Sequence, residues 1–188
     1  MLTFFVCRKT PGTEDGVLEP VPTFSTCYSA PFIILHVRGP SFIVFYFYSS
    51  RHAYYKPSVQ PSRYATMLAE RMAATNANCW LVNTGWTGGK YGTGRRCPLK
   101  YTRRIVDAIH SGELADATTE YENFDVFNLT IPKHIEGVPR EILNPRLAWK
   151  DKGAFQREVV KLATMFQKAF RAYENDVEEP VRMSGPQY

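Results

Sequence analysis

The sequence predicts a mixed α and β (α/β) fold, and three segments support this. Residues 79–82 form a short apolar run, which is typical of a strand buried on both faces. Residues 127–131 form a second short apolar segment, which ends at Pro132. Residues 155–173 repeat apolar side chains every three or four positions, the period of an amphipathic helix. Because strand-like and helix-like segments alternate along the chain, the class is α/β.

The elements before residue 61 are weakly defined. Residues 1–11 show no periodicity, residues 12–22 are polar and turn-rich, and residues 23–28 fit either a short strand or a loop. A helix is expected from Pro61, which suits a first helical turn and is followed by Tyr64, Met67 and Leu68 at helical spacing.

After residue 82 the pattern is clearer. A glycine-rich loop leads to a helix over about 101–110, which stops near Gly112. The strand at 127–131 is followed by a connector between Pro139 and Pro145. The last helix has about five turns. We interpret its apolar stripe as core packing; the stripe consists of Phe155, Val159, Leu162, Phe166, Phe170 and Tyr173.

Composition and charge exclude several classes of protein. The chain has 188 residues, 44% of them hydrophobic and 22% charged, which suits a globular domain. The net charge of +5 favours phosphate-bearing ligands but is too diffuse to indicate nucleic acid. The apolar stretch at 31–49 is broken by Arg38 and Pro40, so neither piece approaches the roughly 18–20 residues of a membrane helix. We therefore expect no nucleic-acid or membrane partner.

The spacing of the cysteines and histidines does not indicate a metal site. The four cysteines show no CxxC pattern, so neither a zinc site nor a disulfide framework is expected, and a reducing cytoplasmic location is the default; they are Cys7, Cys27, Cys79 and Cys97. The histidines are scattered and read as ordinary structural or surface residues; they are His36, His52, His110 and His134.

The segment 83–104 has the strongest chemical signal. Five glycines lie between positions 85 and 94, and such residues let a ligand approach the backbone closely. A loop that ends at a helix start also directs free N–H groups at an anion. Six cations are available to phosphate oxygens: Lys90, Arg95, Arg96, Lys100, Arg103 and Arg104.

Two interpretations of this loop remain open on physical grounds. The loop matches neither common phosphate-binding fingerprint, because Tyr91 follows Gly89 and Lys90, and no GxGxxG lies in the required place. It is either a flexible basic surface loop or a nucleotide site.

Several separate blocks resemble one family, the ATP-dependent phosphoenolpyruvate carboxykinases. Residues 81–88 and 94–103 are similar to its carboxy-terminal signature. Further similar blocks are residues 12–16, 19–27, 107–114, 127–129, 143–146 and 184–188. The resemblance covers about residues 12–36 and 61–188, and implies the carboxy-terminal part of that family's nucleotide-binding domain.

The resemblance implies a function and three site residues. Family members convert oxaloacetate and ATP to phosphoenolpyruvate, carbon dioxide and ADP in gluconeogenesis. Arg96, Cys97 and Thr102 would line the adenosine side of the nucleotide site, with the Arg96 guanidinium, the Cys97 backbone and the Thr102 hydroxyl as the contacting groups. Thr102 could also serve as a helix N-cap, and the two roles could coexist.

Other parts of the family's active site have no match. The resemblance places its phosphate-binding loop, its ligands for a divalent metal (Mg or Mn) and its oxaloacetate-binding arginine upstream of this chain. We therefore assign no catalytic and no metal-binding residue, and predict that the chain alone is inactive. Oxaloacetate and phosphoenolpyruvate would be partners only of the complete enzyme, whereas ATP and ADP are partners here. The sequence leaves a homo-oligomer open.

Two segments depart from the family pattern. Residues 1–11 read as an unstructured non-family leader, and residues 37–60 interrupt the match of 12–188. We interpret 37–60 as a retained intron, with a genuine exposed insertion as the alternative. Its run 42–48 is uncharged, β-prone and free of proline, which predicts aggregation.

Two other functions remain as alternatives. The chain could be a noncatalytic nucleotide-binding or interaction module. A basic nucleic-acid binder would be favoured only by steeply salt-dependent affinity without competition by ATP.

Overall fold

A computed structural model describes residues 7–9, 32–38, 41–47, 63, 66–67, 70, 74, 78–82, 85–89, 92–177 and 179–186. Within these ranges, no helix has both the length and the apolar content needed to cross a membrane. Residues 12–28, with their expected turn and strand or loop, lie outside this set.

One antiparallel sheet contains four described strands in the order β1-β4-β2-β3. They are β1 (Cys7–Lys9), β2 (Phe32–Arg38), β3 (Ser41–Phe47) and β4 (Asn78–Val82). In the register, Leu81 lies opposite Cys7 on one side and Ile34 on the other. Strand β4 is therefore internal to the sheet, and it confirms the strand predicted at 79–82.

Strands β1, β2 and β3 do not follow the segment boundaries predicted from the sequence. Strand β1 lies within residues 1–11, for which the sequence predicts no regular structure, and forms by pairing with β4. Strand β2 crosses the predicted boundary at residue 37, and β3 lies inside the predicted insertion. The interpretation of 37–60 as a retained intron remains a prediction.

Two small hairpins follow. They consist of β5 (Trp86–Thr87) with β6 (Arg95–Arg96), and of β7 (Tyr121–Phe124) with β8 (Leu129–Pro132). Strand β8 begins at Leu129, two residues later than the strand predicted at 127–131. Phe127 ends a 3-10 turn, η2 (Asp125–Phe127), and Asn128 takes the left-handed conformation with φ of 49°. Asparagine tolerates that conformation better than most residues, so it closes the turn.

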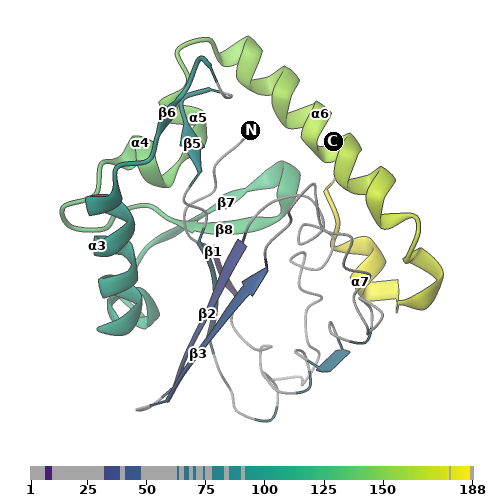
Figure 1. Cartoon of the computed structure of the whole chain (residues 1–188), viewed down its shortest axis with the longest axis horizontal. Helices are drawn as coiled ribbons and strands as arrows, with labels where there is room; N and C mark the ends of the chain where they lie inside the picture. The colour runs from purple at the N-terminus through teal and green to yellow at the C-terminus, as the bar shows by residue number, and fades with distance from the viewer. Residues whose placement is uncertain are drawn as a thin grey trace.

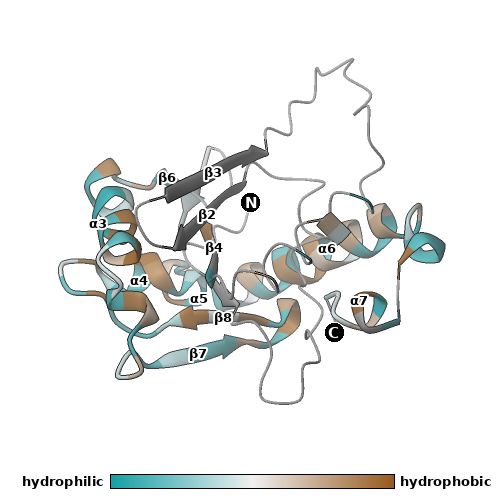
Figure 2. Ribbon diagram, turned by 90° about the horizontal axis from the view of Figure 1, so that it is seen from below, coloured by the Kyte–Doolittle hydropathy of each residue, from teal (hydrophilic) through white to brown (hydrophobic). Residues whose placement is uncertain are grey.

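The longest helix has the predicted amphipathic character. It is α6 (Lys152–Phe170), and Phe155, Val159 and Phe166 are buried along it. Figure 2 shows apolar and polar colours side by side along α6. Tyr173, the last residue of the predicted stripe, lies beyond the helix end.

The remaining helices are shorter. The predicted helix at 101–110 is α3 (Leu99–His110), and the described residues of the helix predicted from Pro61 are helical. The predicted connector contains α4 (Arg140–Leu143) and α5 (Pro145–Ala148). Short elements complete the described set: η1 (Glu113–Ala115), η3 (Glu174–Asp176) and α7 (Glu179–Met183).

Two apolar clusters lie on either side of β4. Leu81 belongs to a cluster with η2, β8 and α6, whose buried members include Phe127, Ile131 and Phe155. Its neighbours Trp80 and Val82 belong to a second cluster with α3, α4 and the segments around Leu114 and Ile135. This alternation follows from the two-residue period of a strand. Figure 1 shows α3 and α6 on opposite sides of β7 and β8.

Candidate functional site

The predicted nucleotide loop contains the short strand pair β5–β6, which lies between β4 and α3 in the chain. Trp86 pairs with Arg96 and Thr87 with Arg95 across its two strands. The Cys97 N–H donates a hydrogen bond of 3.0 Å to the Gly85 carbonyl, which extends the pairing by one residue. Thr87 is buried, so the base of the hairpin is fixed to the fold.

Close backbone packing explains two of the loop glycines. A Cβ atom on Gly94 would lie 2.4 Å from the Gly89 carbonyl oxygen, and one on Gly89 would lie 2.8 Å from the Gly94 nitrogen. Neither position has room for a larger residue. The sequence predicted that the loop glycines let a ligand approach the backbone. At Gly89 and Gly94, the missing side chain instead lets the two backbone segments of the loop pack against each other.

Helix α3 starts directly after the hairpin. Pro98 is its N-cap, with φ of −61° and ψ of 130°, and no acidic residue lies in its first turn. The positive end of the helix dipole is therefore not neutralised by a carboxylate in that turn. A helix start of this kind favours an anion.

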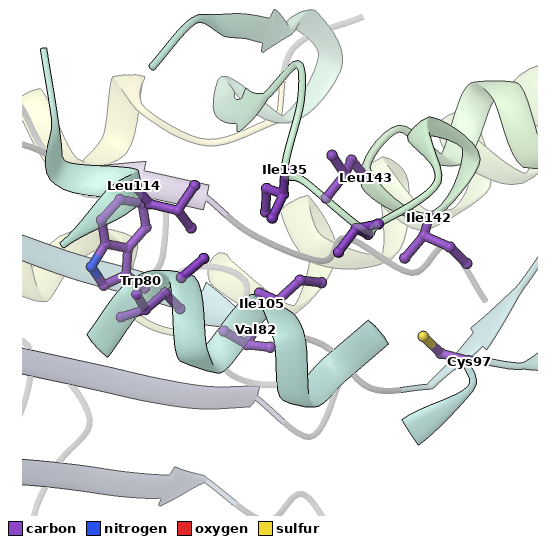
Figure 3. Close-up of a cluster of buried hydrophobic side chains, with 11 residues drawn as sticks. Trp80, Val82, Cys97, Ile105, Leu114, Ile135, Ile142 and Leu143 are labelled. Carbon is purple, nitrogen blue, oxygen red and sulfur yellow. The ribbon is translucent and has the colours of Figure 1, made fainter. Parts of the chain in front are cut away.

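Cys97 and Thr102 lie together. Cys97 is buried, with 9% of its surface exposed, and its Sγ lies 3.9 Å from the Thr102 Oγ1. Burial raises the pKa of the Cys97 thiol, although the Thr102 hydroxyl and the charge of Arg95 act in the opposite direction. Figure 3 shows Cys97 at one end of the cluster that includes Val82 and Ile142. Its side chain is thus a packing group.

The alternative role of Thr102 as a helix N-cap is wrong. Pro98 occupies the cap, and Thr102 is the fourth residue of α3. Pro98 is in an extended conformation and makes no side-chain capping hydrogen bond. The helix begins at Leu99, three residues before Thr102. Thr102 remains available as a half-buried hydroxyl on α3.

Arg96 differs from the other two predicted site residues. It is exposed, and in an extended strand its side chain leaves the face opposite to that of Cys97. No described carboxylate lies within ion-pair distance of Arg96. The structure therefore places Cys97 and Thr102 in contact and Arg96 beside them, directed away from Cys97.

The six cations of the loop differ in their interaction partners. Arg95 pairs with Glu141 at 3.0 Å, and Arg104 pairs with Glu113 at 2.7 Å. The Lys100 ammonium lies 4.8 Å from the centre of the Tyr101 ring. Lys90 lies outside the described residues. Among the described members, Arg96 and Arg103 make neither an ion pair with a described carboxylate nor a contact with a described aromatic ring.

Sequence reasoning missed two residues at this site. Trp86 lies directly opposite Arg96, and the signal for it was the short hairpin spacing around the glycines. Glu141 holds Arg95 from 46 residues away, and nothing local in the sequence indicates that contact.

Metal ligands do not gather in the described part of the chain. Within it, no group of three or more His, Cys, Asp or Glu side chains could hold a metal ion. His110 and His134 are exposed, and His52 lies outside the described residues.

A separate small hollow lies between β7, η2 and α6. It has a volume of about 90 Å³, and its lining includes Glu122, Asn144, Arg146 and Gln156. Asn144 donates a hydrogen bond of 2.7 Å to Glu122 there. Because Arg96, Cys97 and Thr102 do not line it, the hollow is distinct from the predicted site.

Comparison with known proteins supports the resemblance. The family model described as phosphoenolpyruvate carboxykinase matches residues 51–141, a span that includes β4 to β8 and the three predicted site residues. Proteins named phosphoenolpyruvate carboxykinase (ATP) are 48% identical to this chain over 180 residues in Neurospora crassa and 47% identical over 179 residues in Emericella nidulans. The protein of that name from Saccharomyces cerevisiae is 42% identical over 182 residues.

These alignments cover nearly all of this chain but a small part of the relatives. They span 95% of the chain and 26% of the relative from Neurospora crassa, and 96% and 28% for Saccharomyces cerevisiae. The chain therefore spans about a quarter of the length of the curated relatives that it matches. Over nearly its whole length, the chain is therefore similar to about a quarter of an ATP-dependent phosphoenolpyruvate carboxykinase.

Proposed function

We propose that this chain supplies the adenosine-side wall of the ATP site of a phosphoenolpyruvate carboxykinase. The complete enzyme would convert oxaloacetate and ATP to phosphoenolpyruvate, carbon dioxide and ADP in gluconeogenesis. The observation that carries the proposal is the family match across the hairpin and the start of α3. A cytoplasmic location is part of the same proposal.

Each site residue has a role that its surroundings permit. Arg96 is exposed on β6, so its guanidinium is available to a phosphate or to ribose oxygens. The thiol of Cys97 packs inward and its N–H is bonded to Gly85, which leaves its carbonyl as the contacting group. The Thr102 hydroxyl would donate to or accept from the nucleoside.

Charge neutralisation dominates phosphoryl transfer, and a divalent Mg or Mn ion supplies much of it when bound. The described residues hold no cluster suited to such an ion, so we assign no metal-dependent step to this chain. The contribution of its residues is binding and orientation: Arg96 adds positive charge beside the nucleotide, and the buried hairpin base keeps that charge in place.

The proposal is tested by nucleotide binding to the purified 188-residue chain. We expect isothermal titration with MgADP to show saturable binding that Arg96→Ala weakens about tenfold, the effect of losing one charge-assisted hydrogen bond. Arg95→Ala is the matched control, because Arg95 is the adjacent cation and pairs with Glu141. Equal affinity of Arg96→Ala and the wild type would contradict the proposed role of Arg96.

A noncatalytic nucleotide-binding or interaction module is the second candidate, because the chain spans only about a quarter of its relatives. A coupled assay for phosphoenolpyruvate formation separates the two. We expect the chain alone to bind nucleotide without turnover, and the activity to appear in a protein of the relatives' full length that carries this sequence. Turnover by the chain alone would contradict the first expectation, and an inactive full-length protein would favour the module.

A further inference from the structure

We infer that Glu141 is a positioning residue for the nucleotide site. Through its ion pair with Arg95 it holds strand β6 on helix α4, and this fixes the direction in which Arg96 leaves the strand. The inference rests on the proposed function and deepens it, because it names what orients the exposed cation of the site. It is carried by the contacts that the β5–β6 pair makes with α4 and α5.

The two faces of the β5–β6 pair have different surroundings. Side chains alternate between the faces of a strand, so Arg95 and Cys97 share one face of β6 and Arg96 belongs to the other. Cys97 is buried, and so is Thr87, which lies opposite Arg95 in the register. The face that carries Arg95 therefore lies against the fold, and the exposed Arg96 is on the outer face.

The pair is attached to α4 and α5 in three places. Arg95 donates a hydrogen bond of 3.0 Å from its Nη2 to the Oε1 of Glu141 on α4. Cys97 belongs to the same buried cluster as the apolar residues of α4. A Cβ atom on Gly88 would lie 3.1 Å from the Ala148 carbonyl oxygen, so the backbone after β5 passes close to the end of α5. Figure 1 shows α4 and α5 beside β5 and β6.

Two of these contacts flank Arg96 in the chain. Arg95 precedes it and is held by the ion pair, and Cys97 follows it and is held by burial. The backbone of Arg96 is thus fixed on α4 from both sides. Removing the Glu141 carboxylate would leave only the attachment at Cys97, and the side chain of Arg96 would then leave the strand in a wider range of directions.

The expected effect is local and small. The side chains of Arg95 and Glu141 are 67% and 50% exposed, and ion pairs of this kind contribute little to the stability of a whole protein. A strand pair of two residues on each side has few other restraints, so a small contribution shifts its position. The apparent dissociation constant rises as the population of the binding-competent arrangement falls. We expect that population to fall to about a third without the ion pair.

The first experiment tests the attachment without nucleotide. The Cys97 N–H donates to the Gly85 carbonyl, so its hydrogen exchange reports opening of the strand pair. We expect Glu141→Ala to speed this exchange about threefold and to leave exchange in α6 unchanged. Glu113→Ala is the matched control, because it also removes a carboxylate paired with an arginine, here Arg104 on α3. An unchanged exchange rate of the Cys97 amide in Glu141→Ala would overturn the inference.

The second experiment measures binding of MgADP by isothermal titration. Glu141→Ala removes a negative charge near a site for phosphates, so charge alone predicts equal or tighter binding. Positioning predicts the opposite sign: we expect binding about threefold weaker, with the melting temperature nearly unchanged. Glu113→Ala should bind as well as wild type or better. Equal or tighter binding by Glu141→Ala would overturn the inference.

Variants of Arg95 show whether Glu141 acts through it. Arg95→Ala should also bind less tightly, by less than the tenfold loss expected for Arg96→Ala, and adding Glu141→Ala to it should cause no further loss. Glu141→Arg should weaken binding although it adds a positive charge. Combining it with Arg95→Glu should restore most of the affinity, because the ion pair re-forms with its charges exchanged. Additive losses in the double alanine variant, or no recovery in the exchanged pair, would overturn the inference.

The experiments separate this inference from the proposed function. If the wild-type chain has no affinity for MgADP, the proposed function fails, and exchange of the Cys97 amide alone decides whether Glu141 fixes β6. If the wild type binds and Glu141→Ala binds equally well, the proposed function stands and the positioning role is overturned. Far-UV circular dichroism identifies any variant that fails to fold, and the remaining variants of the pair then decide.

Discussion

At the scale of single residues, Cys97 contributes to the fold through both its backbone and its side chain. Its backbone N–H extends the β5–β6 hairpin, and its thiol closes one end of a buried cluster. A nucleophilic role is disfavoured by the surroundings, because burial raises the pKa of the thiol and so reduces the thiolate present at neutral pH.

We predict that Cys97 reacts slowly with iodoacetamide at neutral pH and faster as pH rises beyond the ordinary pKa of a thiol. Its raised pKa in the folded chain means that the folded state holds this proton more tightly than the unfolded state. The stability from this group is therefore present below the unfolded pKa and lost as pH rises through the folded pKa. Mass mapping of the alkylated peptide containing Cys97 measures the rate. Fast alkylation at neutral pH in folded protein would contradict the prediction.

The three site residues remain a prediction that rests on the resemblance to a family, because charge alone does not separate them from their neighbours. Six cations between positions 90 and 104 look alike in sequence, yet Arg95 and Arg104 are held by Glu141 and Glu113. Arg95 is on strand β6 and its partner Glu141 is on helix α4, so their pairing depends on the tertiary fold. Local sequence carries no information on that contact.

At the scale of elements, the β5–β6 hairpin depends on Gly94. We predict that Gly94→Ala lowers the melting temperature and weakens MgADP binding, because a Cβ there would lie 2.4 Å from the Gly89 carbonyl oxygen. Gly92→Ala is the matched control: its φ of 89° is strained for alanine, but no atom lies within 4 Å of the added Cβ. Thermal unfolding and titration should therefore show a larger loss for Gly94→Ala. Equal losses in both variants would show that backbone conformation, and not close packing, sets the requirement.

Helix α6 depends on its N-cap. The Asp151 carboxylate accepts a hydrogen bond of 2.9 Å from the Ala154 N–H, and this bond is the main cause of the lowered pKa of Asp151. We predict that Asp151→Ala lowers the melting temperature by a few degrees and that Asp151→Ser recovers most of the loss.

The contribution of Asp151 should also depend on pH. Because its pKa is lower in the folded chain, its stabilisation is present above the unfolded pKa and is lost as pH falls through the folded pKa. The difference in melting temperature between wild type and Asp151→Ala should therefore shrink in acid. A constant difference across that range would contradict a charged cap.

The elements with strong periodicity were predictable, and those that depend on pairing were not. Helix α6 follows from its apolar stripe alone. Strand β7 has the sequence YENF, whose two central residues are polar, and it exists through its pairing with β8. The pair β5–β6 is two residues long on each side, too short for any periodic signal.

At the scale of the molecule, β4 is shared by the two apolar clusters. Leu81 packs with Phe155 and the rest of the α6 side, while Trp80 and Val82 pack with Ile105 and the rest of the α3 side. A strand whose successive residues belong to different clusters couples them mechanically, because displacing it exposes both. The α3 cluster also contains Cys97, so the candidate site is attached to this shared strand.

We therefore predict that the two clusters unfold as one cooperative unit. Leu81→Ala and Ile105→Ala each remove a buried side chain from a different cluster and should each cost about 2–5 kcal/mol. Hydrogen exchange should then speed up in both α3 and α6 for either variant, by similar factors within each variant. Met165→Ala is the control, because Met165 is on α6 and 52% exposed, and should change exchange little. Faster exchange confined to α6 in Leu81→Ala, or to α3 in Ile105→Ala, would show that the clusters unfold separately and that β4 does not couple the candidate site to α6.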